Sequence, residues 1–162
     1  MKIPSTTLII FGASGDLAKL KLFPAIKELK AQNRLPAEFQ IIGFARSPKP
    51  KTQNIDYIQG DYTNLEDFKK LKAQIKHKHI LSYFAVPPNI FQPIVQNLAE
   101  AKIKTKLILE KPFGENAKTS KELFHFISKY FYEKDIYLLD HYLGKNAVKS
   151  LLHLRHENRI LN

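Results

Sequence analysis

Short apolar runs alternate with longer amphipathic segments along the chain, and this alternation constrains the fold more than any other feature. The apolar runs have the length of buried strands, and the longer segments have the apolar spacing of helices. Strands are expected at residues 6–11, 39–44, 80–86, 106–109 and 135–139, with a further short strand at 57–59. Helices are expected at residues 16–32, 64–76, 90–102 and 119–133, with Asn64 and Thr119 as N-caps of the second and fourth.

Strands that alternate with helices pair in parallel, because each helix carries the chain back to the start of the next strand. The pattern therefore predicts an α/β fold, a Rossmann-like doubly wound and mostly parallel sheet with helices on both faces. The 162 residues suit one domain, and 44% hydrophobic with 25% charged residues is typical of a globular protein.

Composition excludes several kinds of site. The chain has no cysteine, which removes disulfides, thiolate nucleophiles and cysteine-ligated zinc, and no other metal site is predicted. No apolar run is long enough for a membrane helix, and the N-terminal run is too short for a signal peptide. We therefore expect a cytoplasmic protein that does not bind membranes.

The net charge of +11 and the pI near 9.7 favour a negatively charged partner, whether nucleic acid, an acidic surface or phosphorylated small molecules. The densest basic run is KKLKAQIKHKH, residues 69–79. Its lysines alternate with apolar residues as on an amphipathic helix, which favours a solvated helix face over nucleic-acid binding.

A glycine-rich turn follows the first predicted strand directly. With the lysine after it, the turn GASGDLA comprises Gly12, Ala13, Ser14, Gly15, Asp16, Leu17, Ala18 and Lys19. In a βαβ unit a dinucleotide pyrophosphate binds here, because glycines let the backbone approach the phosphates and the positive end of the next helix attracts them. The glycines have GxxG spacing instead of GxGxxG, so a plain tight turn is the alternative.

The second predicted strand ends in GFARS. An NAD enzyme usually places a carboxylate here, which accepts a hydrogen bond from the ribose 2′-hydroxyl. Arg46 can instead pair with a 2′-phosphate, and Ser47 can donate to it, so this strand end favours NADP over NAD. Without the glycine turn, an ordinary surface arginine would be the better interpretation.

Two polar motifs follow later strands. Lys111 of EKPFG, at the end of the strand KLILE, can reach both a nicotinamide and a substrate. DHYLGK follows the strand IYLL, and the donors of His141, Tyr142 and Lys145 suit a phosphate monoester dianion. Asp140 can orient a neighbouring histidine as a base. Taken singly, these residues also have structural interpretations, as a cap, a structural histidine or a solvated lysine.

In this order, GASGDLA, GFARS, YFAVPP, EKPFG and DHYLGK resemble the glucose-6-phosphate dehydrogenase family, from Thr6 to the end of the chain. That family oxidises the C1 hydroxyl of glucose 6-phosphate to 6-phosphogluconolactone and passes hydride to NADP, the first step of the oxidative pentose phosphate pathway. The resemblance implies an oxidoreductase with NADP as cofactor. It also implies that residues 1–162 are a single NAD(P)-binding Rossmann-type domain, truncated at its C-terminus relative to the family.

The resemblance assigns roles to individual residues. The cofactor-binding residues would be those at 12–19, Arg46, Ser47, Tyr83 of YFAVPP, and Lys111. The substrate-binding residues would be Lys111, His141, Tyr142 and Lys145. Asp140 and Lys111 would be catalytic, and Asp140 would act by pairing with the histidine that removes the C1 hydroxyl proton.

That histidine lies in the family's larger second domain, and no histidine of this chain stands in its motif. Leu138 also departs from the family, which often has arginine there. Without the second domain, an apolar face is expected to be exposed, so the implied partners are a second-domain polypeptide or another copy of the chain.

Three alternatives stay open. The first is a catalytically inactive NADP-binding module or regulator, which explains intact cofactor motifs without a base. The second is the sugar oxidoreductases that carry an EKP motif after a glycine turn, although they do not explain DHYLGK. The third is a nucleic-acid-binding protein, which rests on charge alone.

Overall fold

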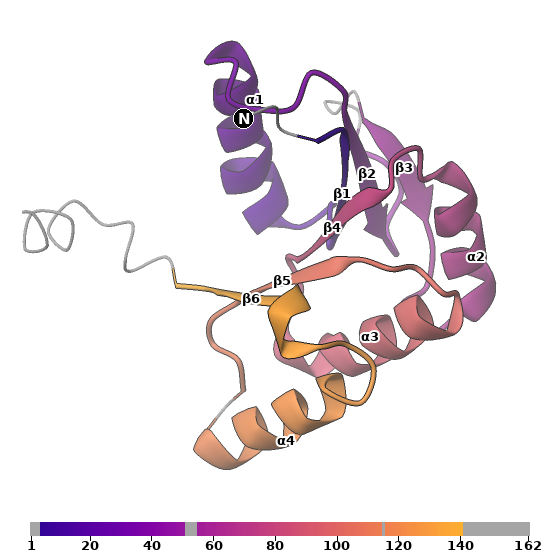
Figure 1. The fold of residues 1–162 in the computed structure, drawn as a ribbon, viewed down its shortest axis with the longest axis vertical. Coiled ribbons are helices and arrows are strands. Elements are labelled where there is room, and N and C mark those ends of the chain that lie inside the picture. The colour runs from indigo at the N-terminus through magenta and orange to yellow at the C-terminus, as the bar shows by residue number, and fades with distance from the viewer. Residues whose placement is uncertain (1–3, 51–54, 115, 141–162) are drawn as a thin grey trace, which may run out of the picture.

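A parallel sheet forms the centre of the protein in a computed structural model that describes residues 4–50, 55–114 and 116–140. The strands within these ranges are β1 (Thr6–Phe11), β2 (Phe39–Ala45), β3 (Asp56–Gln59), β4 (His79–Phe84), β5 (Lys106–Glu110) and β6 (Ile136–Leu139). They lie in the order β3-β2-β1-β4-β5-β6, and every neighbouring pair is parallel (Figure 1). The predicted doubly wound sheet is confirmed, including its short strand near residues 57–59.

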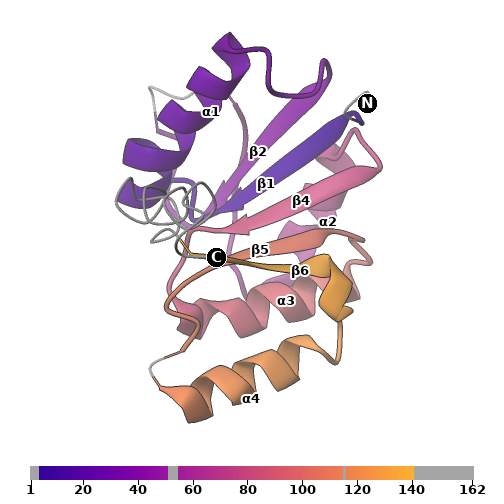
Figure 2. The ribbon, with the colours of Figure 1, turned by 60° about the vertical axis from the view of Figure 1, so that its left-hand side comes forward.

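Helices cover both faces of the sheet, as predicted (Figure 2). A π-helical turn at Ala18–Leu22 leads into α1 (Phe23–Ala31), which lies on one face. The other face carries α2 (Leu65–Gln74), α3 (Phe91–Glu100) and α4 (Ala117–Ile127), with short 3₁₀ turns at Pro88–Ile90 and Glu133–Asp135. Since strand side chains alternate, the central β1 serves both layers: Leu8 and Ile10 pack toward α1, and Ile9 and Phe11 toward the other helices.

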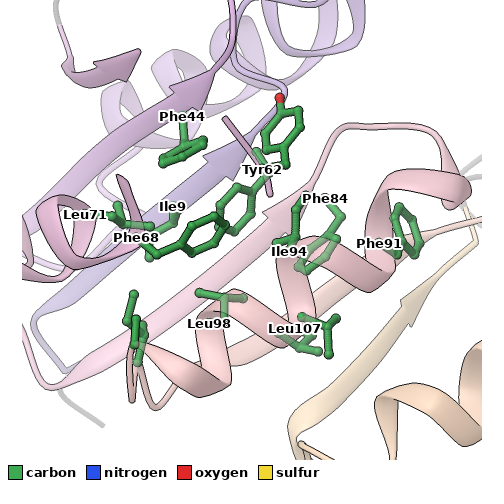
Figure 3. Packing of buried hydrophobic residues seen from close by; sticks show 14 of the residues in the cluster. Ile9, Phe44, Tyr62, Phe68, Leu71, Phe84, Phe91, Ile94, Leu98 and Leu107 are labelled. Carbon is green, nitrogen blue, oxygen red and sulfur yellow. The ribbon is translucent and has the colours of Figure 1, made fainter. Parts of the chain in front are cut away.

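The layer beneath α2 and α3 is rich in buried aromatic rings (Figure 3). The Phe11 ring stacks on Phe68 of α2 with centroids 5.8 Å apart, and it contacts Phe44 and Phe84 at 5.5 and 5.4 Å. Burying each such side chain stabilises the fold by roughly 1.5–3 kcal/mol. These contacts fix β1, β2 and β4 relative to one another, and with them the loops that follow these strands.

The expected N-cap of α2 is confirmed, but that of α4 is wrong by three residues. The Asn64 side chain accepts from the Glu66 amide at 3.0 Å, as a cap does. In α4 the cap is Asn116, and Thr119 is the third helical residue, whose hydroxyl accepts from the Asn116 amide at 3.0 Å. Asn116 and Thr119 can both cap a helix and are three residues apart. The reciprocal bonds of a capping box favour Asn116 as the cap. The helix also ends at Ile127, well before the predicted residue 133.

The connection from β2 to β3 comprises only residues 46–55. Parallel neighbours usually need a crossover of a dozen or more residues, most often a helix. Among the described residues, α1 is therefore the sole helix on its face, and that face is open beside β5 and β6 (Figure 2). Tyr137 and Leu139 of β6 are 47% and 41% exposed.

Within the same described ranges, no helix combines the length and apolar character that crossing a membrane would require.

Candidate functional site

The candidate site lies where the parallel strands end. The carboxyl ends of β1, β2, β5 and β6 all lie on one side of the sheet, because parallel strands share their direction (Figure 2). The strand order reverses between β1 and β4, which are neighbours although β2 and β3 separate them in sequence. In open α/β sheets, ligands bind in the crevice outside such a reversal.

The glycine turn makes a close approach to the next strand. Gly12 has φ of +83°, a left-handed conformation that favours glycine, and a Cβ placed there would lie 2.2 Å from the Ala85 carbonyl oxygen. The Gly12 amide donates to the Phe44 carbonyl at 2.9 Å, and the Gly15 amide donates to the Gly12 carbonyl at 2.9 Å. Only a residue without a side chain fits at position 12, so the turn packs directly against the residues that follow β4.

The other turn residues divide into a buried and an accessible set. Ala13 and Ala18 are fully buried and shape the turn without offering polar side chains. Asp16 and Lys19 are exposed, and Ser14 is half-buried. The chain is helical from residue 16 onward, so the first amides of this helix point toward the strand-end edge. The first amides of the helix therefore form a cradle for an anion, with the Ser14 hydroxyl and the Lys19 ammonium beside it.

Arg46 follows β2 directly and is exposed. Its guanidinium carbon lies 5.7 Å from the centroid of the Tyr62 ring, and its carbonyl accepts from the Gln59 side chain at 3.2 Å. Arg46, Gln59, Gly60 and Asp61 line an open hollow. Arg46 is thus positioned by an aromatic face while its charge remains accessible, an arrangement that suits phosphate.

Asp61 is the carboxylate nearest this hollow. The Thr63 hydroxyl and amide donate to it at 2.7 and 2.8 Å, and these bonds lower the pKa of Asp61, with a smaller contribution from the charge of Arg46. Asp61 does not form an ion pair with Arg46 among the described residues. The guanidinium therefore keeps its donors for a ligand.

Tyr57 connects the glycine turn with the end of β2. Its hydroxyl donates to the Ser47 carbonyl at 2.7 Å and also bonds the Ser14 side chain. Burial raises the pKa of Tyr57, and the bond with Ser14 opposes that shift. The sequence-based interpretation named Ser14 and Ser47 but missed Tyr57 and Tyr62. The sequence gives little indication of these two tyrosines, because Tyr57 lies in a short strand and Tyr62 lies just after it.

Tyr83 of β4 is buried and its hydroxyl donates to the Glu110 carboxylate at the end of β5. The pKa of Tyr83 is strongly raised by burial, and then by the bond with Glu110 and the negative charge of that carboxylate. The predicted site residue Tyr83 thus lies within β4, and its hydroxyl is engaged by Glu110 at the end of β5. Glu110 was missed as a site residue, although it opens the EKPFG motif.

Lys111 and Asp140 come together across β5 and β6. The two strands pair with Glu110 opposite Leu139, and the Lys111 amide donates to the Leu139 carbonyl at 3.3 Å. This register brings Lys111 Nζ to 2.8 Å from Asp140 Oδ2. The peptide bond between Lys111 and Pro112 is cis.

A hollow of about 260 Å³ joins the two halves of the site. Leu17 lines it from the glycine turn, and Glu110 and Lys111 line it from the end of β5. The predicted residues of the first and fifth strands therefore face a common space. His141, Tyr142 and Lys145 lie outside the described residues, and within those residues no cluster of histidine, aspartate or glutamate could hold a metal ion.

Comparison with known proteins agrees with this geometry. The family model described as "Glucose-6-phosphate dehydrogenase, NAD binding domain" matches residues 9–53 and 49–150. The two matches meet in the short β2–β3 connection. The glucose-6-phosphate 1-dehydrogenase of Cyberlindnera jadinii is 37% identical over 96% of the chain, and that of Helicobacter pylori strain J99 is 36% identical over 96%. The chain spans 39% and 43% of these two relatives, about two fifths of their length.

Solved structures lead to the same family. A structure described as glucose-6-phosphate dehydrogenase in complex with its substrate superposes with a TM-score of 0.83 at 32% identity, over 100% of this chain and 42% of that one. The glucose-6-phosphate 1-dehydrogenase of Mycobacterium avium superposes with a TM-score of 0.81 at 31% identity, over 98% of this chain and 41% of that one. With its glycine cradle at the β1 end and its Lys111–Asp140 pair at the β5 and β6 ends, the chain belongs to the glucose-6-phosphate dehydrogenase family and corresponds to the dinucleotide-binding domain of that family.

Proposed function

We propose that this chain is the NADP-binding part of an enzyme that oxidises glucose 6-phosphate to 6-phosphogluconolactone. The observation that supports this most is the exposed guanidinium of Arg46 beside a glycine cradle, at the strand end where an NAD enzyme has a carboxylate. Family membership supports the chemistry. The chain spans about two fifths of the length of these relatives.

The residues present fit a dinucleotide. Gly12 lets the turn pack directly against the Ala85 carbonyl, where a Cβ would clash, and Ser14 and Lys19 add donors beside the start of the helix. Arg46 and Ser47 would hold the 2′-phosphate, and Tyr83 would border the nicotinamide end. When bound, the nicotinamide supplies the two-electron acceptor of the oxidation.

The remaining residues would bind and orient the sugar. Lys111 lines the hollow between the glycine turn and β5, and it would contact both the cofactor and the sugar. Asp140, 2.8 Å from Lys111, would orient the histidine that takes the C1 hydroxyl proton. His141, Tyr142 and Lys145 would hold the sugar phosphate. The base itself would come from a second-domain polypeptide, and the reaction would belong to the oxidative pentose phosphate pathway in the cytoplasm.

A catalytically inactive NADP-binding module or regulator is the second candidate. Among the described residues, His77 precedes β4, His79 begins β4 at the opposite end of the strand from the candidate site, and His125 is on α4. This alternative predicts a chain that binds NADP and does not oxidise glucose 6-phosphate.

Calorimetric titration with NADP and NAD tests the cofactor assignment. Arg46→Ala should weaken NADP about tenfold or more, because a charge-assisted bidentate contact is lost, and should leave NAD within about twofold. Arg34→Ala, an exposed arginine after α1, is the matched control and should change neither affinity. An equal loss for both cofactors would refute the 2′-phosphate assignment.

An activity assay separates the two candidates. NADPH formation with glucose 6-phosphate should be absent for the chain alone and should appear when a polypeptide carrying the remainder of a longer relative is added. NADP binding without activity in any such mixture would favour the inactive module.

A further inference from the structure

A second cavity lies at the amino-terminal ends of the strands, on the side of the sheet opposite to the glycine turn. It has a volume of about 620 Å³, and its lining residues come from the starts of β4 and β5 and from the connection between α4 and β6. Figure 2 shows that these segments lie together at one end of the strands. This volume is within the usual range for small-molecule sites, roughly 300–1,000 Å³. The proposed dehydrogenase chemistry uses none of the residues that line it.

The rim of this cavity is strongly positive. Four lysines line it, and Asp135 is the single acidic residue among its lining residues; the lysines are Lys78, Lys102, Lys104 and Lys106. Within the described part of the chain, none of the four is paired with a carboxylate. Like charges that gather without carboxylate partners create a potential that attracts an anion.

Two features hold the basic residues in place. Lys106 Nζ donates to the Tyr137 hydroxyl at 3.3 Å and lies 5.6 Å from the centroid of that ring. Lys102 has a left-handed φ of 55°, and its amide donates to the Ala99 carbonyl at 2.9 Å in the turn that ends α3. The lysines on this turn are therefore presented by an ordered backbone, which lowers the entropic cost of binding.

Aromatic and aliphatic side chains form the rest of the cavity. Tyr130 and Tyr132 are 40% and 77% exposed, unusually open for such large rings, and Ile80 and Ile103 lie deeper. Exposed tyrosine rings can stack on a planar ligand. The cavity thus offers an apolar surface next to a cluster of ammonium groups.

His79 adds one further polar group. The Thr6 hydroxyl donates to the Pro4 carbonyl at 2.7 Å, so the contact of 3.1 Å between this hydroxyl and His79 Nδ1 requires Nδ1 to carry the hydrogen. His79 lines the cavity, and its Nε2 is then an acceptor when the ring is neutral.

We propose that this cavity binds a nucleotide, that is, a phosphorylated small molecule with a planar ring, at a second site separate from the dinucleotide crevice. Lysine ammonium groups would contact the phosphates, and the tyrosine rings would contact the base. The site is independent of the proposed dehydrogenase function, since its residues come from the opposite edge of the sheet.

Titration of the isotopically labelled full chain with ATP, followed by amide chemical shifts, tests the proposal. ATP should shift the amides of residues 102–106 and 130–135, and inorganic tripolyphosphate should bind there about tenfold more weakly because it cannot stack. The double variant Lys102→Glu/Lys104→Glu should weaken ATP about tenfold or more at these amides. The control Lys27→Glu/Lys30→Glu on α1 carries the same change in charge and should stay within about twofold.

Three results would overturn the proposal. Shifts confined to residues 12–19 would mean that ATP uses the dinucleotide crevice alone. Equal affinity for tripolyphosphate would remove the role of the tyrosine rings. Saturation of the same amides by a single-stranded oligonucleotide at a concentration far below that of ATP would assign the surface to nucleic acid.

Discussion

The ammonium nitrogen of Lys111 lies 2.8 Å from a carboxylate oxygen of Asp140, so the register of β5 and β6 brings together two motifs that are 29 residues apart in sequence. Both residues follow directly from their strand ends, and both carry proposed roles toward the sugar. The pair is partly solvated, with 57% and 24% of the two side chains exposed. The ion pair therefore contributes little to stability, and its main effect is to position the Lys111 ammonium and the Asp140 carboxylate.

The variant Asp140→Asn distinguishes the contribution of this ion pair to stability from its proposed role in catalysis. Partly exposed ion pairs contribute at most about 1 kcal/mol, so the free energy of unfolding in urea should change by no more than that. Activity restored by the remainder of a relative should fall about 100-fold or more, because the amide no longer stabilises a protonated histidine. Restored activity equal to that of the parent chain would contradict the assigned role of Asp140.

Gly12→Ala should destabilise the fold and abolish dinucleotide binding. The new Cβ would lie 2.2 Å from the Ala85 carbonyl oxygen at a φ of +83°, so the turn must shift; we expect a loss of about 2–4 kcal/mol in urea unfolding. Gly15→Ala is the matched control, since its Cβ would lie 3.2 Å from the Gly12 carbonyl and its φ is ordinary. A similar loss for both variants would argue against a special role of Gly12.

Tyr83 should make the free energy of unfolding fall as the pH becomes strongly alkaline. Its pKa in the folded protein is raised above the ordinary value of 10.0 by burial and by Glu110, so the folded state holds the proton more tightly than the unfolded chain. The resulting stability is fully present below pH 10 and is lost as the pH rises above it. Tyr83→Phe should flatten this decline in urea unfolding between about pH 9 and 11. An unchanged slope would show that the neighbouring Tyr57 and Tyr62 account for the dependence.

Asn116→Ala should destabilise the protein by about 1 kcal/mol, because the capping box of α4 loses its acceptor for the amides of Lys118 and Thr119. Asn64→Ala on α2 offers a comparison with a single capping bond and should cost less. Thermal unfolding of both variants measures the difference, and a larger loss at Asn64 would contradict the reciprocal cap.

Much of the site could be predicted because its residues follow strand ends. Once strands were assigned from local apolar runs, Gly12, Arg46, Lys111 and Asp140 were placed at one edge by the common direction of parallel strands. Contacts between elements could not be predicted in this way. The ring of Tyr62 beside Arg46 and the bond from Tyr83 to Glu110 join segments that the local pattern treats separately.

The amino-acid sequence alone determined the α/β class, the positions of the strands and the family, because these follow from side-chain periodicity and short motifs. The tertiary structure decided the strand order β3-β2-β1-β4-β5-β6, the register that pairs Lys111 with Asp140, and the choice of Asn116 over Thr119 as cap. It also created the basic cavity at the far edge of the sheet, from residues between 78 and 135. Local patterns limit each segment, whereas packing across the sheet selects among the arrangements that those patterns allow.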